Sequence, residues 1–296
     1  MRIFAGAGVS AGSAGYTAGG FDISNVEKLF FKNDATAAVS TGLSVNRGAG
    51  SGLNSSTSGY VAAGYGGGVR LSSIDKYLLS NDSRSTLAAT LSSIRNEAAS
   101  FSSSTSGYVA GGYSTARVTT VNKLTFSTEA TTTTTSLPIA TVTFGAFSSS
   151  SAGYTLGGDQ SGGNVTTVYK FLFSNDSRST LGTGLSHLGK YGTTGFAGSD
   201  AGYACGGYNV DDYDVATVDK FAFSNDSRST LGTGLSKITT AAVGYNSSTS
   251  GYLVGGLGHG LGTHKKTDTF AFSNDARSVL NDGLRQARSY MAGFKS

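Results

Sequence analysis

The most acidic short segment of the sequence is Y-N-V-D-D-Y-D, which contains Asp211, Asp212 and Asp214. Carboxylate oxygens are the ligands that Ca²⁺ prefers in proteins. The D-D-Y-D order nevertheless lacks the alternating ligand spacing of a calcium-binding loop. We therefore interpret these residues as a solvated acidic loop and predict no metal there.

His259 and His264 are a second set of ligand-type side chains, five residues apart in a Gly-rich stretch. Imidazole nitrogens bind zinc and copper, but structural zinc sites usually add cysteines at characteristic spacings. The chain has one cysteine, Cys205, and it lies far from this segment in the sequence. The sequence predicts neither a metal site nor a cofactor.

Several tyrosines and polar residues stand in segments that resemble those of the acidic and histidine sets in composition. A tyrosine ring with a hydroxyl suits stacking on a polar ligand such as a sugar, although these rings also suit the simple covering of a Gly-rich core. The candidate binding residues in these segments, beside the acidic and histidine sets, are Tyr65, Arg70, Tyr113, Arg117, Asp159, Gln160, Tyr208 and Tyr213.

A repeat explains how these segments are positioned. A Gly-Tyr pair followed by a small-residue-Gly step occurs six times, with its tyrosines at Tyr16, Tyr60, Tyr108, Tyr154, Tyr203 and Tyr252. About ten residues later comes V-x-K-hydrophobic-x-F, then a turn that reads S-N-D-x-R-S in its clearest form. The segment T-L-G-T-G-L-S follows, and we expect it to form the last strand of the repeat. A short apolar-Gly-aromatic segment leads to the next Gly-Tyr. The series of Lys and Arg residues recur with the repeat, so we expect structural roles, with the Arg reaching an adjacent repeat.

Each period of about 48 residues has room for four short strands separated by turns, a spacing typical of all-β folds. One four-stranded sheet cannot cover both its faces, whereas sheets packed radially cover one another and leave only short edges. We predict an all-β, six-bladed β-propeller with four antiparallel strands per blade. The expected blades are 1–44, 45–92, 93–137, 138–186, 187–236 and 237–285, with 286–296 as a closing strand in one domain. An open solenoid is the alternative.

The apolar-Gly-aromatic segment occurs seven times, at Arg2–Ser10 and again at Arg288–Ser296, among other places. One end segment is enough to complete a ring. We expect the C-terminal segment to join the first sheet. The surplus N-terminal copy then flanks that sheet, stays loose, or pairs with another subunit in a homo-oligomer by strand addition.

Strands that run up and down in turn place alternate loops on opposite faces. The turns S-N-D-S-R-S and N-S-S-T-S hardly vary and share one face, which we call the turn face. The segments after the Gly doublet and after Leu-Ser vary in length and share the other face, which we call the loop face. Function concentrates on variable loops held by a rigid scaffold, so all the candidate residues above are predicted to lie on the loop face near the central channel.

The repeat resembles the kelch motif, on the evidence of G-Y-V-A-G-G (107–112), V-N-K-L-T-F-S and T-E-A-T-T-T-T-T-S-L. It departs from that motif because the chain has no Trp. The near-identical copies at 168–186 and 218–236 look like the Gly/Ser/Thr-rich kelch-like arrays of phage tail or virion proteins and of some bacterial surface proteins. The resemblance implies a virion structural protein or an extracellular surface protein that contacts other virion or surface proteins, or a host glycan in attachment.

Two other functions stay open. An intracellular, cytoplasmic scaffold for protein–protein interaction is the first. An enzyme similar to the copper oxidases of the kelch fold is the second, and it would need Tyr and His residues converging on the axis. This chain offers only His187, His259 and His264, and no Ser-His-Asp set is visible, so the prediction is not an enzyme.

Composition limits the other classes of partner. Charged residues are 14% and the net charge is +4 without a basic stripe, which argues against nucleic acid as a partner. No run of 18 apolar residues exists, so no membrane insertion is expected. The 15 Tyr and 16 Phe favour a folded chain over a disordered one.

Overall fold

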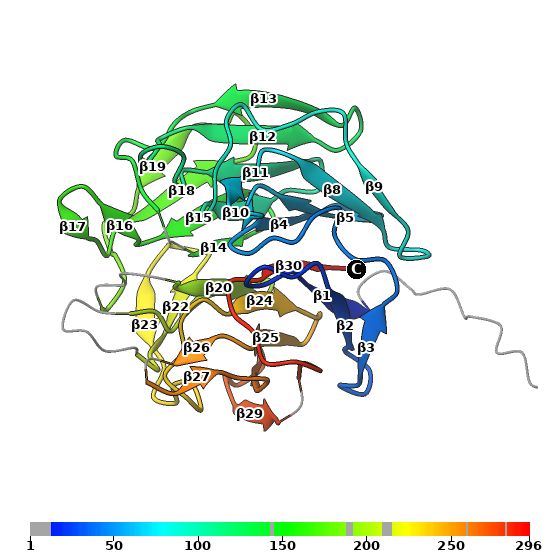
Figure 1. Cartoon of the computed structure of the whole chain (residues 1–296). Helices are drawn as coiled ribbons and strands as arrows, with labels where there is room; N and C mark the ends of the chain where they lie inside the picture. Colours follow the sequence, from blue (N-terminus) through cyan, green and yellow to red (C-terminus); the bar gives the residue numbers. More distant parts are fainter. Residues whose placement is uncertain (1–12, 143–144, 188–191, 209–214, 259, 282) are drawn as a thin grey trace, which may run out of the picture.

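The structure is a computed structural model, which describes residues 13–142, 145–187, 192–208, 215–258, 260–281 and 283–296. Six four-stranded antiparallel sheets stand around a common centre (Figure 1). The predicted all-β, six-bladed propeller is confirmed. The described residues form strands and turns but no helix, and thus contain no helix able to cross a membrane.

The innermost strands of blades 1 to 6 are β30 (Ala292–Lys295), β4 (Ser51–Asn54), β10 (Ala99–Ser102), β14 (Gly145–Ser148), β20 (Thr194–Ala197) and β24 (Val243–Asn246). The second strands are β1 (Ala14–Ala18), β5 (Ser58–Ala62), β11 (Ser106–Ala110), β15 (Ala152–Leu156), β21 (Ala201–Cys205) and β25 (Ser250–Val254). The second strands carry the Gly-Tyr motif, and the side chains at its Tyr positions are buried in every blade.

The third strands are β2 (Val26–Phe30), β8 (Ile74–Leu78), β12 (Val121–Thr125), β18 (Val168–Leu172), β22 (Val218–Ala222) and β28 (Thr267–Ala271). The fourth, outermost strands are β3 (Thr36–Val39), β9 (Arg84–Thr86), β13 (Ala130–Thr134), β19 (Arg178–Thr180), β23 (Arg228–Thr230) and β29 (Arg277–Leu280).

The expectation that T-L-G-T-G-L-S forms the fourth strand was wrong in its bounds. In blade 4 the strand β19 covers Arg178–Thr180, and the chain then turns toward the next blade. The Leu185 amide donates to the Thr166 carbonyl at 2.8 Å. A Cβ on Gly184 would stand 2.5 Å from the same Thr166 oxygen, so the second glycine of the motif is there for this close approach rather than for a strand.

Three two-stranded hairpins on the loop face were not predicted. They follow the second strand in blades 2, 4 and 6 and consist of β6 (Tyr65–Gly66) with β7 (Val69–Arg70), β16 (Asp159–Gln160) with β17 (Gly163–Asn164), and β26 (Leu257–Gly258) with β27 (Gly262–Thr263). Gly67 and Gly68, at the first of these turns, have φ of 58° and 82°, a conformation that Gly adopts without strain.

The C-terminal strand closes the ring, as predicted. β30 pairs antiparallel with β1, with Tyr16 opposite Phe294 and Ala18 opposite Ala292. The first blade therefore takes its innermost strand from the end of the chain and its other strands from the beginning (Figure 1). The surplus copy at Arg2–Ser10 lies outside the described residues.

The glycine of every Gly-Tyr pair makes room for a side chain of the preceding blade. A Cβ on Gly153 would stand 2.0 Å from the ring of Phe101, and one on Gly251 would stand 2.0 Å from the ring of Phe196. The equivalent approaches are Tyr245 to Gly15, Phe294 to Gly59, Leu53 to Gly107 and Phe147 to Gly202. The repeat glycine is therefore a packing contact between blades.

The tyrosine of the same pair belongs to a second blade-to-blade contact. Tyr154 and Lys170 lie opposite each other in β15 and β18, and both donate to Asp226 of blade 5, at 2.9 and 2.8 Å. The acceptors lie at positive φ in the S-N-D turns, for example 57° for Asp226, and in the equivalent S-T-E turn, where Glu129 has φ of 54°. Five blades use a lysine in this way: Lys28 to Asp82, Lys76 to Glu129, Lys123 to Asp176, Lys170 to Asp226 and Lys220 to Asp275.

The arginines of the turn were expected to reach the adjacent blade, but not all of them do so. Arg277 donates to the Gly234 carbonyl of blade 5 at 2.6 Å. Arg84 instead donates to Thr86 of its own strand at 3.1 Å. The regular inter-blade cation is thus the lysine of the third strand.

Candidate functional site

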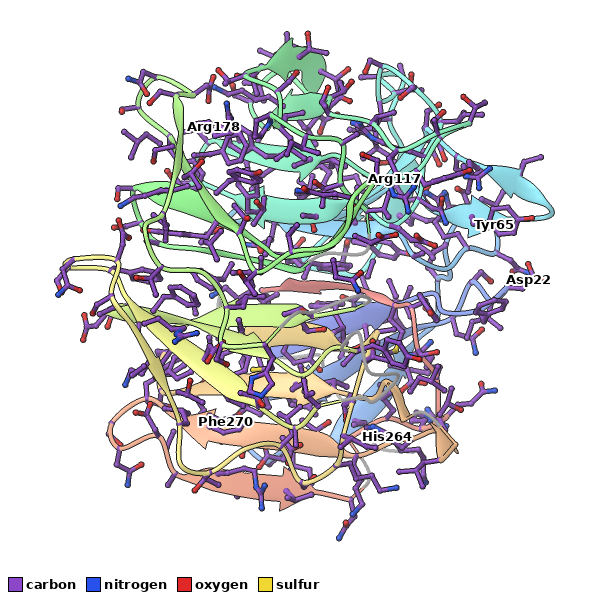
Figure 2. The ribbon with its side chains drawn as sticks, turned by 90° about the vertical axis from the view of Figure 1, so that its left-hand side faces the viewer. Asp22, Tyr65, Arg117, Arg178, His264 and Phe270 are labelled. Atoms are coloured by element: carbon purple, nitrogen blue, oxygen red, sulfur yellow. The ribbon has the colours of Figure 1, made fainter. Side chains whose placement is uncertain are left out.

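The loops of the two faces separate as the strand order requires. In the side view, Asp22, Tyr65, Arg117 and His264 lie toward one face of the disc and Arg178 toward the other (Figure 2). The first four belong to segments between second and third strands, and Arg178 opens a fourth strand just after a turn. The predicted candidates that the structure describes therefore occupy the loop face.

Arg70 is the centre of one cluster on this face, between blades 2 and 3. Its guanidinium lies 5.9 Å from the ring centroid of Tyr65 and 4.5 Å from that of Tyr113. Its Nε donates to Asn96 Oδ1 at 3.0 Å. A cation held against aromatic faces is stabilised by the ring quadrupoles, so these contacts hold Arg70 and Tyr113 in fixed positions on blades 2 and 3. Tyr65 remains 42% exposed.

Arg117 extends the cluster to blade 4. It donates to Asp159 Oδ2 at 2.5 Å, and an isolated bridge pairs its backbone with Tyr113. Gln160, beside Asp159, donates from Nε2 to Thr141 Oγ1 at 3.1 Å and is buried. The sequence candidates of three loops, far apart in the chain, thus come together.

Glu97 lies next to this cluster and was not predicted. Burial raises the pKa of Glu97, while the neighbouring charges of Arg70 and Arg117 lower it and that of Asp159 raises it. Asn96 Nδ2 donates to its Oε1 at 3.3 Å. Glu97 also lines the central cavity, so it connects the loop-face cluster to the channel.

The mouth of the channel on the loop face has a rigid backbone rim. The amide of Glu97 donates to the Ala49 carbonyl at 3.0 Å, that of Ala49 to Tyr290 at 2.7 Å, and that of Tyr290 to Ala241 at 2.9 Å. These four residues have φ between 51° and 57°, which non-glycine residues rarely adopt. Links from blade to blade hold that conformation and fix the width of the opening.

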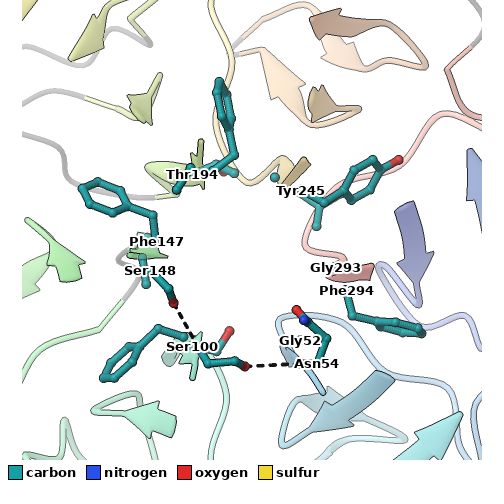
Figure 3. A pocket seen from close by; sticks show the side chains of 18 of the residues that line it. Gly52, Asn54, Ser100, Phe147, Ser148, Thr194, Tyr245, Gly293 and Phe294 are labelled. Carbon is teal, nitrogen blue, oxygen red and sulfur yellow. Dashed lines mark hydrogen bonds between the residues drawn. The ribbon is translucent and has the colours of Figure 1, made fainter. Parts of the chain in front are cut away.

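The channel itself is a cavity of about 790 Å³ between the six innermost strands. The aromatic side chains of these strands, such as Phe147 and Phe294, point away from it into the blades, whereas Ser148 and Asn54 face it (Figure 3). This alternation follows from the period of two along a strand. The volume of the channel falls in the range of small-molecule pockets.

The remaining candidates are not part of the cluster. Tyr208 lies on blade 5 and is half-buried. His264 lies on blade 6, where its Nε2 is 3.3 Å from Thr239 Oγ1 and burial lowers its pKa. Asp211, Asp212, Tyr213, Asp214 and His259 lie outside the described residues.

The residues required by the enzyme alternative stand in different surroundings. Cys205 is buried in the apolar cluster of blade 5, and burial raises the pKa of its thiol well above the usual value. His187 is exposed and lies 3.0 Å from Ser186 Oγ. Over the described ranges, no three His, Cys, Asp or Glu residues gather as a metal-binding group.

Exposed apolar side chains also concentrate on the loop face. Nine large apolar side chains are exposed in the described part of the chain, and only Leu78 and Leu172 stand at the ends of third strands, next to the turn face. The other seven lie in loop-face segments: Phe21, Val45, Tyr65, Val69, Ile94, Ile139 and Leu261.

Comparisons with known proteins support the architecture. No family model matches the chain, and no curated protein matches it. A solved structure described as "Structure of YjhT" superposes with a TM-score of 0.75 at 16% sequence identity and covers 92% of this chain and 98% of its own. At this identity the likeness concerns the fold, which is the six-bladed propeller.

Proposed function

We propose that this protein is a non-catalytic structural or binding module that contacts a partner protein through its loop face. The observation that carries the proposal is the distribution of exposed apolar side chains, seven of nine on one face. Protein interfaces combine apolar and aromatic residues with Arg at a rigid surface. The loop face has this combination, because Arg70 and Tyr113 are held in place beside exposed Tyr65 and Val69.

The partner belongs to a virion or to a cell surface in this proposal. Support comes from the low content of charged residues, 14%, and from the resemblance of the near-identical repeats to kelch-like arrays of phage tail proteins. An intracellular scaffold is the competing placement. Mass spectrometry of purified particles or envelopes against cell fractions separates the two, since enrichment in the soluble cell fraction would refute the virion or surface placement.

A glycan is the second candidate partner, and Tyr65 is the observation that favours it. Tyr65 is 42% exposed and its ring lies beside the Arg70 guanidinium, which is the combination of apolar face and donor that sugar recognition uses. A glycan array with the wild type and with Tyr65→Ala tests this directly. A wild-type signal that is lost in Tyr65→Ala supports a glycan partner. An array without any wild-type signal excludes a glycan partner.

The contact face is tested by paired variants. Phe21→Ser with Val69→Ser removes apolar area from the loop face, where these side chains are 76% and 57% exposed. Leu78→Ser with Leu172→Ser makes the same chemical change beside the turn face. We expect the first pair to lose association with the particle or envelope fraction and the second pair to retain it, with equal thermal stability in both. Loss by the second pair alone would place the contact on the turn face.

The non-catalytic part of the proposal has its own test. Metal analysis of the pure protein and an oxidase assay with added copper are expected to give no bound metal and no turnover. Copper bound at one equivalent with oxidase activity would replace the proposal by the enzyme alternative.

A further inference from the structure

The wall of the central channel has two layers, because alternate residues of each innermost strand face it. The layer nearer the loop face is Gly52, Ser100, Ala146, Gly195, Gly244 and Gly293. The layer nearer the turn face is Asn54, Ser102, Ser148, Ala197, Asn246 and Lys295. The first layer is almost without side chains, and the second is polar at every position except Ala197. Asn54 and Ser148 of the second layer are labelled in Figure 3.

Lys295 is the one charged residue in the second layer. The other five blades place Asn, Ser or Ala at the equivalent position, so the fold closes without a charge there. Across the described residues that line the cavity, the other charged side chain is Glu97, at the loop-face end. A repeat-independent charge in a cavity is the kind of feature that function, rather than packing, explains.

The surroundings of Lys295 leave its charge without a carboxylate partner among the described residues. Its Nζ donates to Asn246 Oδ1 at 3.0 Å, which is a neutral acceptor. Burial lowers the pKa of Lys295, and no neighbouring charge offsets that effect. A partly buried ammonium with a neutral partner is stabilised when an anion enters beside it.

Neutral donors extend from Lys295 around the same layer. Asn54 Nδ2, on the neighbouring blade 2, has no protein acceptor in the described part of the chain. Ser102 Oγ accepts from the backbone N–H of Asn54 at 3.2 Å, and Ser148 Oγ accepts from the backbone N–H of Ser102 at 3.1 Å (Figure 3). Since each oxygen accepts from backbone, its own hydroxyl proton remains available for a ligand in the channel.

We propose that this layer of the channel binds a small oxyanion, a carboxylate or phosphate group, with Lys295 as its counter-charge and the Ser and Asn side chains as hydrogen-bond donors. Oxygens of such groups accept from ammonium, hydroxyl and amide donors alike. The site lies inside the ring and is separate from the loop-face contact of the proposed function.

Calorimetric titration with inorganic phosphate, malonate and neutral glycerol tests the site. The variant is Lys295→Met, which keeps most of the stem and removes the charge. The matched control is Lys32→Met, since Lys32 is exposed outside the channel. We expect one or both anions to bind the wild type and the control, glycerol to give no heat, and Lys295→Met to bind about tenfold more weakly or not at all.

A second measurement avoids dependence on the folding of Lys295→Met. The lysines of the wild type are dimethylated with ¹³C-formaldehyde, and phosphate or malonate is titrated while the methyl resonances are followed. A shift confined to Lys295 supports the site, and the anion that causes it identifies the group recognised. Binding heat that is unchanged in Lys295→Met would place the anion away from Lys295 and refute the site. A Lys295 resonance unmoved by either anion at tens of millimolar would refute it as well.

Discussion

Gly153→Ala tests whether the repeat glycine exists for contact between blades. The added Cβ would lie 2.0 Å from the Phe101 ring, where ordinary contacts are 3.4–4 Å. That ring cannot easily retreat, because it is 2% exposed and stacks on Tyr108 at 5.0 Å and packs against Phe171 at 5.3 Å. Overpacking of this kind costs about 1–3 kcal/mol.

The expected result is a fall in Tm of about 2–9 °C, taking about 2–3 °C for each kcal/mol in a chain of this size. Gly182→Ala is the control, because a Cβ there meets nothing within 4 Å, and its effect should stay within about 0.5 kcal/mol. In a Phe101→Leu background the cost of Gly153→Ala should shrink, since the smaller side chain leaves room. Equal stabilities of Gly153→Ala and Gly182→Ala, measured by calorimetry, would show that the glycine is not needed for the contact with Phe101.

Three further predictions concern the ring and its charges. Asp226→Ala removes the acceptor of Tyr154 and Lys170 and should destabilise by about 1.5–3 kcal/mol in urea unfolding, so a loss below 0.5 kcal/mol would count against it. Burial raises the pKa of Asp176, but hydrogen bonds, chiefly from Lys123, hold it below the usual value. The contribution of ionised Asp176 to the free energy of unfolding is therefore complete above about pH 4 and is lost as the pH falls through the lowered pKa. The Tm difference between wild type and Asp176→Asn should accordingly vanish at acid pH. Deletion of 287–296 removes β30 and should lower the Tm sharply or prevent folding, whereas an unchanged Tm would contradict closure by that strand.

Much of the fold follows from the repeat because a ring uses the same contacts at each interface. The Gly-Tyr and V-x-K positions recur in the sequence since each makes the same contact with an adjacent blade. The fourth strand was predicted too far toward the C-terminus, because T-L-G-T-G-L-S recurs in the repeat and was therefore taken for a strand. Gly184 of this motif instead allows a close approach to Thr166. Which atoms a glycine meets is not visible in one sequence.

The loop-face cluster was predictable in its members but not in its contacts. The alternation of loops places Arg70, Tyr113 and Asp159 on one face, and the structure groups them. Glu97 was missed because it lies in a short connection between blades, and a single carboxylate there carries no pattern. Lys295 was missed because it stands at a repeat position where the other five blades have Asn, Ser or Ala. A comparison of the repeats identifies the residues that recur and not a residue that occurs in one copy.

Hydroxyl-radical footprinting of the protein within purified particles or envelopes, against the free protein, tests the loop-face contact most directly. The probes are exposed apolar side chains on the two faces, which the reagent labels when they are accessible. We expect protection of Phe21, Val69 and Leu261 and unchanged labelling of Leu78 and Leu172. Protection of Leu78 and Leu172 with the loop face still labelled would contradict the loop-face contact.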